Sequence, residues 1–358
     1  MCQTIKLFLS IFLALILTSC SLQHHDAKVQ QKNENIDTLK DENLKKIAQQ
    51  NSDNKVLLLL PLSGTNAELG KGILNACILA ANESTYQNID FIIVDTADRS
   101  LDKNQLASKY KKDKHKKDNI RAIIGPVFFT EAKRYGALFP NTPMFTFSNN
   151  IKANSKHIFA CGLSPQDEIN EIFAYARRKD ISSFLIMLPK GNYGDEIEQY
   201  LKKSMKNFDF DDENDVEIIR YDKMDRKKAT KYAKESGKQG IFVLDPILDI
   251  LELSESMKVF TLSSNALQDR EAWLGSVFAF SNIQELFKFS EKYKAIFGHT
   301  PSVLDMIGYD IVTLLCKFGN DPNEIFVLEN KQLQGCLGEF TITKDHGLKR
   351  RLRLYESE

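Results

Sequence analysis

The chain has 358 residues, of which 27% are charged and 42% are hydrophobic, a composition typical of a water-soluble globular protein. Its 48 basic and 48 acidic residues cancel to a formal net charge of +0, which does not favour a nucleic-acid partner. A chain of this length suits two lobes of ordinary size better than one small hydrophobic core.

The first twenty residues have the layout of a secretory signal. Lys6 precedes an apolar run from Leu7 to Leu17, which is too short to span a bilayer, and Ser19 then leads into Cys20. This ending resembles the lipobox of bacterial lipoproteins, whose cysteine is acylated and becomes the new N-terminus. The resemblance implies a signal peptide at residues 1–20, lipid attachment at Cys20 and a membrane surface as partner. An ordinary cleaved signal with a coincidental cysteine is the alternative.

Residues 21–54 are polar and charged, and they predict a flexible tether between the lipid and the folded body. Ser21 stands where many lipoproteins of enteric bacteria carry an aspartate that retains them in the inner membrane. The lipoprotein resemblance therefore implies an outer-membrane anchor that faces the periplasm.

The folded body begins with the apolar strand Lys55–Pro61, and strands and helices then alternate. Short apolar runs that end at turns are typical of strands buried on both faces of a parallel sheet. The alternation indicates a parallel sheet with helices on both faces. After the first strand, the expected elements are helix Ala67–Glu83, strand Phe91–Val94, helix Lys103–Lys114, strand Ala122–Ile124, helix Thr130–Leu138 and strand Met144–Phe147.

The same alternation restarts and indicates a second α/β lobe. Its expected elements are helix Gln166–Arg178, strand Phe184–Leu188, helix Asp195–Met205, strand Val216–Tyr221, helix Arg226–Glu235 and strand Ile241–Leu244. Two later helices, Leu286–Phe297 and Val303–Phe318, break this order. A hairpin is expected after them, in which Gly338–Thr343 pairs with Leu352–Tyr355 and turns near Asp345-His346-Gly347.

Such an ending favours lobes that exchange segments across a hinge. The predicted first lobe comprises residues 55–160 and 280–330. The predicted second lobe comprises residues 161–279 and 331–358.

Several motifs carry a family likeness over about residues 55–356. The opening Val56–Gly70, the turn Ile123–Pro126, the pair Tyr193-Gly194 and the late Tyr309-Asp310 resemble the type I periplasmic binding proteins of the leucine-binding class. The likeness implies an α/β fold of two lobes. Each lobe is a parallel sheet flanked by helices, and a multi-strand hinge joins the two.

Within that superfamily, the chain resembles the penicillin-binding protein activator lipoproteins. The likeness lies in Leu58-Leu-Leu-Pro-Leu-Ser-Gly64, in Gly125-Pro-Val-Phe-Phe129 and in Phe147-Ser148. Some members of that family bind and stimulate a peptidoglycan synthase rather than a transporter.

In open α/β sheets, ligands bind at the carboxyl ends of the strands, so the loops there supply the candidate cleft residues. The candidates are Ser63, Gly64, Phe128, Phe129, Ser148, Asn149, Tyr193 and Asp245.

Each candidate also has a structural interpretation. Phe128 and Phe129 stand where amino-acid-binding relatives have small hydroxyl residues, and a carboxylate beside two phenyl rings loses hydration without gaining donors. Packing against the lobe or the hinge is the alternative for these rings. Ser63 could cap the next helix, Tyr193 could cover the lobe edge, and Asp245 could be a turn residue before proline.

No motif for catalysis is present: the sequence has no nucleophile elbow, P-loop, HExxH or Rossmann glycine pattern. No CxxC pair or Cys/His cluster indicates a metal or a cofactor. Cys77 and Cys316 lie in helix-like apolar patterns that favour buried free thiols, and pairing of Cys161 with Cys336 stays open.

Two non-enzymatic functions therefore stand side by side. The first, implied by the closer resemblance, is an interaction partner of a penicillin-binding protein. The second is a substrate-binding lipoprotein that serves an ABC permease and closes on amino acids or similar small polar solutes in the interlobe cleft.

Overall fold

The computed structural model describes residues 54–84, 89–110, 120–149, 157–210, 215–223, 225–269, 271–317, 330–344 and 346–357. The signal peptide, Cys20 and the predicted tether up to residue 53 lie outside these ranges, as do the expected helix end at 111–114, Phe318 and Asp345. The chain divides after Ser52 into two units, and the described residues all belong to the second, Asp53–Glu358. None of the described helices is both long enough and apolar enough to cross a bilayer.

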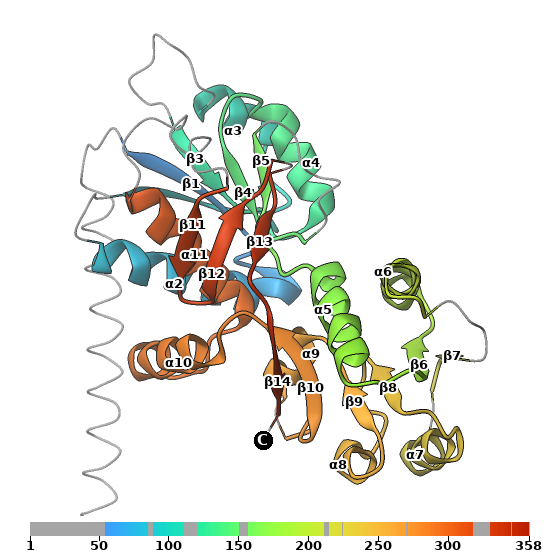
Figure 1. Ribbon diagram of the computed structural model, residues 1–358. Helices are drawn as coiled ribbons and strands as arrows, with labels where there is room; N and C mark the ends of the chain where they lie inside the picture. Colours follow the sequence, from blue (N-terminus) through green and yellow to red (C-terminus); the bar gives the residue numbers. More distant parts are fainter. Residues whose placement is uncertain are drawn as a thin grey trace, which may run out of the picture. The chain divides into compact units, whose positions relative to one another are not determined.

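The first lobe is built on a parallel five-stranded sheet (Figure 1). In spatial order its strands are β2 (Asp90–Asp95), β1 (Lys55–Leu60), β3 (Ile120–Ile124), β4 (Met144–Thr146) and β5 (Ile158–Ala160). Helix α2 (Ala67–Glu83) covers one face, and α3 (Lys103–Tyr110) and α4 (Phe129–Leu138) cover the other. Since both faces are covered, Val56–Leu60 and Ala122–Ile124 of β3 are buried, as their unbroken apolar runs predict.

The second lobe is built on a six-stranded sheet. In spatial order its strands are β14 (Arg353–Glu356), β10 (Ser276–Phe280), β9 (Lys258–Phe260), β8 (Gly240–Val243), β6 (Phe184–Pro189) and β7 (Val216–Tyr221). All pair in parallel except β14, which runs antiparallel to β10. Its helices are α5 (Pro165–Arg178), α6 (Asn192–Asn207), α7 (Arg226–Glu235), α8 (Ile250–Ser254) and α9 (Ser263–Gln268).

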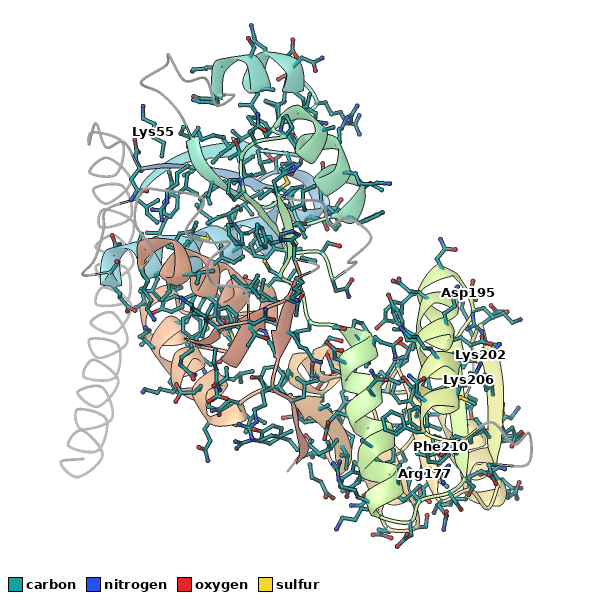
Figure 2. The ribbon with its side chains drawn as sticks, turned by 45° about the horizontal axis from the view of Figure 1, so that its top comes forward. Lys55, Arg177, Asp195, Lys202, Lys206 and Phe210 are labelled. Atoms are coloured by element: carbon teal, nitrogen blue, oxygen red, sulfur yellow. The ribbon has the colours of Figure 1, made fainter. Side chains whose placement is uncertain are left out.

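Helix α6 shows how the sequence pattern sets these layers. Its Ile197 and Leu201 are buried against the sheet, whereas Lys202 and Lys206 lie on the exposed side of the helix (Figure 2). Below them, the guanidinium of Arg177 lies 4.0 Å from the ring centroid of Phe210. Amphipathic spacing alone therefore tells which face of α6 meets the core.

Each lobe contains one close approach between a helix and the strand before it. A Cβ at Gly70 of α2 would overlap the carbonyl oxygen of Pro61, and a Cβ at Gly194 of α6 would overlap that of Pro189. Only glycine permits this contact, which sets how near the first helical turn lies to the strand end. The same glycine-dependent approach of helix to strand end thus occurs in both lobes.

After β10 the chain returns to the first lobe. Helices α10 (Ile283–Phe297) and α11 (Val303–Lys317) pack there, and α11 has its most extensive contact with α2. The Tyr293 hydroxyl donates to the Gly72 carbonyl (3.1 Å), and the buried Arg121 of β3 donates to the Leu315 carbonyl (2.7 Å). Through these contacts, segments far apart in the sequence pack together in the first lobe.

The C-terminal stretch corrects one expectation. Strand β12 (Gly338–Ile342) pairs with β13 (Leu348–Arg350) and β11 (Gln332–Gly335), so the prediction that it pairs with Leu352–Tyr355 is wrong. Residues 353–356 instead form β14 in the second sheet. Backbone hydrogen bonds of Thr343 with Gly347 and His346 bring only Leu348–Arg350 into register with β12, and the chain beyond reaches the free edge of β10. The exact lobe boundaries stay a prediction.

A buried carboxylate joins this third sheet to α11. Asp310 is 3% exposed; it accepts the backbone N–H of Cys336 (2.5 Å) and lies 3.4 Å from the guanidinium of Arg350. Burial raises the pKa of Asp310, whereas Arg350 and the N–H groups of Cys336 and Leu337 act against that rise. A Cβ at Gly335 would overlap the same carboxylate. One side chain thus ties β11, β13 and α11 together.

We expect Asp310→Ala to lower the free energy of unfolding by about 3–5 kcal/mol, because it leaves the guanidinium of Arg350 buried without its counter-charge. Urea denaturation measures this change. Glu339→Gln is the control, because it removes the exposed ion pair with Arg351 (3.7 Å) and should cost less than about 1 kcal/mol. Equal effects of the two substitutions would contradict the role assigned to Asp310.

Candidate functional site

A cleft of about 1050 Å³ is lined by residues of both lobes. Its first-lobe wall comes from the ends of β3 and β4 and the start of α4, and its second-lobe wall from the starts of α5 and α6. Helices α10 and α11 contribute a third side. The predicted position at the carboxyl ends of the strands is therefore where the cavity lies.

The first-lobe wall is largely aromatic. Phe128 is the N-cap of α4 and is 41% exposed, and Phe129 begins the same helix. After β4, Ser148 is buried and Asn149 is exposed, and both also line the cleft. All four of these candidates thus lie on the first-lobe wall, and their binding role stays a prediction.

The second-lobe wall carries a phenol and two carboxylates. Tyr193 lies in the first turn of α6, not in a loop before it, and is 49% exposed. Glu168 of α5 and Glu196 of α6 line the same wall. Burial, followed by the negative charges of Glu168, Asp245 and Glu196, raises the pKa of Tyr193 to about 12. The tyrosine hydroxyl therefore lies in a region of negative potential.

Glu168 is the most unusual group of the cleft, because its carboxylate is buried. It accepts the backbone N–H of Ser263 (2.7 Å) and the Ser263 hydroxyl (3.0 Å). Burial raises its pKa to about 7; the two hydrogen bonds from Ser263 oppose this rise, and the charge of Asp167 adds to it. Sequence analysis missed Glu168, since it lies one turn into a helix and not at a strand end.

Ser63 and Gly64 are not among the residues that line the cleft. Ser63 makes no side-chain cap to the following helical turn. Instead, Ser63 binds Asp95. Burial alone would raise the pKa of Asp95, but hydrogen bonds from Ser63 and from the N–H groups of Leu62 and Ala97 lower it overall. Ser63 therefore helps to order the turn between β1 and α2.

Asp245 also lies behind the lining. Its carboxylate accepts the hydroxyl of Tyr221 (2.6 Å), which ties the carboxyl end of β7 to that of β8. Burial and this hydrogen bond raise the pKa of Tyr221. Asp245 does not line the cleft, but its negative charge contributes to the raised pKa of Tyr193, which does.

Helices α10 and α11 supply cleft residues that the strand-end rule could not find. These cleft residues all lie on the two late helices that pack on the first lobe. They include Leu286, Phe287, Ser290, Glu291, Lys294 and Met306. The amphipathic pattern predicted these helices, but not that one face of α10 and the start of α11 line the cavity.

The described side chains include no group of three or more His, Cys, Asp or Glu residues placed to hold a metal ion. Cys77, Cys161, Cys316 and Cys336 are free thiols, and the first three are buried. Burial raises the pKa of each of these thiols. The free thiols of Cys77 and Cys316 agree with their apolar helical pattern. The cleft can thus hold a ligand by apolar contact, hydrogen bonds and charge.

The pKa of Glu168 makes stability depend on pH. The folded chain binds this proton more tightly than the unfolded chain does, so the contribution is fully present below pH 4.5 and lost as pH rises through about 7. The loss is about 3 kcal/mol. We therefore expect Glu168→Gln to lose about 3 kcal/mol less than the wild type between about pH 4.5 and pH 8, as measured by urea denaturation.

Glu255→Gln, which neutralises an exposed carboxylate of the same lobe, is the control for this measurement. Parallel pH profiles for the wild type and Glu168→Gln would contradict the burial of a titrating carboxyl in the cleft.

Solved structures of the same fold include both solute-binding and regulatory proteins. A branched-chain amino acid ABC transporter periplasmic ligand-binding protein from Burkholderia xenovorans has a TM-score of 0.66 and 16% identity, over 85% of this chain and 90% of that chain. The C-domain of LpoA (YraM) from Haemophilus influenzae, a regulator of PBP1A, has a TM-score of 0.59 and 17% identity, over 85% and 98%. Full-length LpoA of that organism has a TM-score of 0.63 and 18% identity, with 87% of this chain and 58% of its own length covered.

At such identities, the likeness establishes the fold: two α/β lobes of the type I periplasmic binding proteins, as the sequence motifs implied. No curated protein sequence matches the chain. The model of the family described as "LppC putative lipoprotein" matches residues 28–227, which is more than half of the chain. The chain therefore belongs to the LppC lipoprotein family.

Proposed function

We propose that this protein is a lipid-anchored protein of the bacterial cell envelope that binds and activates a peptidoglycan synthase of the penicillin-binding protein type. The observation that carries the proposal is the family match over residues 28–227. The likeness to the LpoA C-domain supports it, because 98% of that domain is covered and LpoA is described as a regulator of PBP1A. On this proposal the protein is a regulator and not an enzyme.

The cleft wall adds a physical reason to prefer this function over amino-acid transport. A free amino acid would bring a carboxylate next to Phe128 and Phe129, whose rings supply no hydrogen-bond donor. Regulation of a synthase needs no such ligand. It needs a stable two-lobed body held near the membrane. Lipid attachment at Cys20 and the tether of residues 21–54 would hold the body at the periplasmic face of the outer membrane.

The second candidate is a substrate-binding lipoprotein of an ABC transporter. One observation favours it, namely that the two lobes enclose a cleft of about 1050 Å³, close to the upper end of the size range of small-molecule sites. Of the residues predicted to bind such a solute, Tyr193 lies in the lining and Ser63 does not. Tyr193→Ala should therefore weaken solute binding if this candidate is right.

The synthase proposal predicts a saturable complex between the full chain, purified in detergent, and a class A penicillin-binding protein of its host. We expect a Kd of about 1 μM or tighter, which corresponds to about 8 kcal/mol, together with faster glycan polymerisation by the synthase. A binding assay with the synthase immobilised on a surface measures the Kd, and a polymerisation assay measures the rate of glycan synthesis. The chain unfolded by heat is the control, and no binding to any class A synthase of the host would refute the proposal.

The anchor proposal predicts that Cys20→Ala moves the protein from the membrane fraction to the soluble fraction, because the acyl chains have no attachment site. Cys2→Ala is the matched control, since Cys2 belongs to the predicted signal peptide and should leave fractionation unchanged. Sucrose-gradient fractionation then separates outer from inner membrane. Retention of Cys20→Ala in the membrane fraction would contradict lipid attachment at this residue.

A further inference from the structure

The charges that line the cleft do not balance. Among its described lining residues, three are carboxylates, Glu168, Glu196 and Glu291, and one is an ammonium, Lys294. Glu291 and Lys294 are both exposed and lie one turn apart on α10, so they largely offset each other at the rim. Glu196, and above about pH 7 also the buried Glu168, leave the second-lobe wall negative.

The aromatic side chains of the cleft are unusually exposed for their size. Phe128 (41%) and Tyr193 (49%) rank among the most exposed large apolar side chains described, and they come from opposite lobes to line one cavity. Exposed apolar side chains that gather in one cavity, rather than lying scattered over the surface, are typical of a ligand-binding groove. The face of an aromatic ring attracts cations, and this attraction strengthens when water is excluded.

The carboxylates and the phenol of the second lobe form one group. Glu168 and Glu196 line the same wall as Tyr193, and together with Asp245 they make the electrostatic potential at its hydroxyl negative. A positive charge placed there would meet the ring and two lining carboxylates together. Charge complementarity therefore selects a cation for this wall.

The opposite wall is less suited to an anion. Phe128 is the N-cap of α4 and makes no side-chain hydrogen bond, so the first backbone N–H groups of the helix are the donors that an anion would meet there. The first turn of α4 already carries Glu131, whose negative charge interacts favourably with the positive end of the helix. A ligand carboxylate at this position would compete with Glu131 and lose hydration against the phenyl rings of Phe128 and Phe129.

We propose that the interlobe cleft binds an organic cation, an amine or quaternary ammonium on an apolar or aromatic body, and not a free amino acid. The ammonium lies against Tyr193, Glu168 and Glu196, and the apolar body lies against Phe128 and Phe129. This inference does not rest on the proposed function. It holds whether or not the protein activates a synthase.

The test is an isothermal titration of the full chain in detergent with four ligands of one shape but different charge. 2-Phenylethylamine is the cation, 2-phenylethanol the neutral match, 3-phenylpropanoate the anion and L-phenylalanine the zwitterion. We expect saturable binding of the amine, at least about tenfold weaker binding of the alcohol and of the zwitterion, and no binding of the anion. Titration into detergent alone corrects for uptake by micelles.

Two pairs of variants assign the contact. Glu196→Gln keeps an acceptor for the Tyr200 hydroxyl (2.9 Å) but removes the charge, so the amine should bind about tenfold more weakly. Glu255→Gln, outside the cleft, should leave the affinity unchanged. Tyr193→Phe should retain most of the affinity, whereas Tyr193→Leu should lose it with the ring face.

Three outcomes would overturn the proposal. The first is no saturable binding of the amine. The second is equal binding of amine and alcohol, which would mean apolar partitioning without recognition of charge. The third is tighter binding of L-phenylalanine than of the amine, which would assign the cleft to amino acids. None of these outcomes bears on binding to a penicillin-binding protein, so the two proposals fail separately.

Discussion

The buried carboxylate of Asp310 is the interaction on which the C-terminal half of the molecule depends. It lies on α11, which packs on α2 of the first lobe, and it binds the backbone of Cys336 and the guanidinium of Arg350. Three residues after Arg350, β14 begins and pairs with β10 of the second sheet. A charge that cannot remain unpaired in the interior thus fixes where the last strands leave one lobe for the other.

This anchoring makes the cleft a property of the whole chain rather than of either lobe. The described chain passes between the sheets after β5, after β10 and after β13, so each wall is attached to the other through several strands. Phe128 and Tyr193 face one cavity only because these crossings hold the two lobes together. The aromatic wall comes from the first lobe and the acidic wall from the second, which separates apolar from electrostatic recognition.

Membership of the LppC family and the leucine-binding-type fold point to different uses of the same body. The fold positions a cavity at the carboxyl ends of its strands, where solute receptors bind their ligands. Phe128 and Phe129 give one wall of that cavity an apolar surface without side-chain hydrogen-bond donors, which limits what the cavity can hold. A regulator of cell-wall synthesis and a small-molecule site are therefore compatible in one protein, and each requires its own evidence.

The sequence by itself determined the α/β class, the two lobes and most helices and strands. Strands buried on both faces have unbroken apolar runs, and amphipathic helices have apolar residues with a 3.6-residue period, so both are visible in the sequence. Helix α2 begins and ends where its pattern predicts, and Phe128, Phe129, Ser148, Asn149 and Tyr193 reach the cleft. Tertiary structure alone decided that β12 pairs with β13, that Glu168 is buried and that Ser63 and Asp245 stand behind the lining. The pairing of strands, the burial of a charge and the placement of two cleft walls opposite each other all depend on contacts between residues far apart in the chain. Local sequence patterns do not specify such contacts.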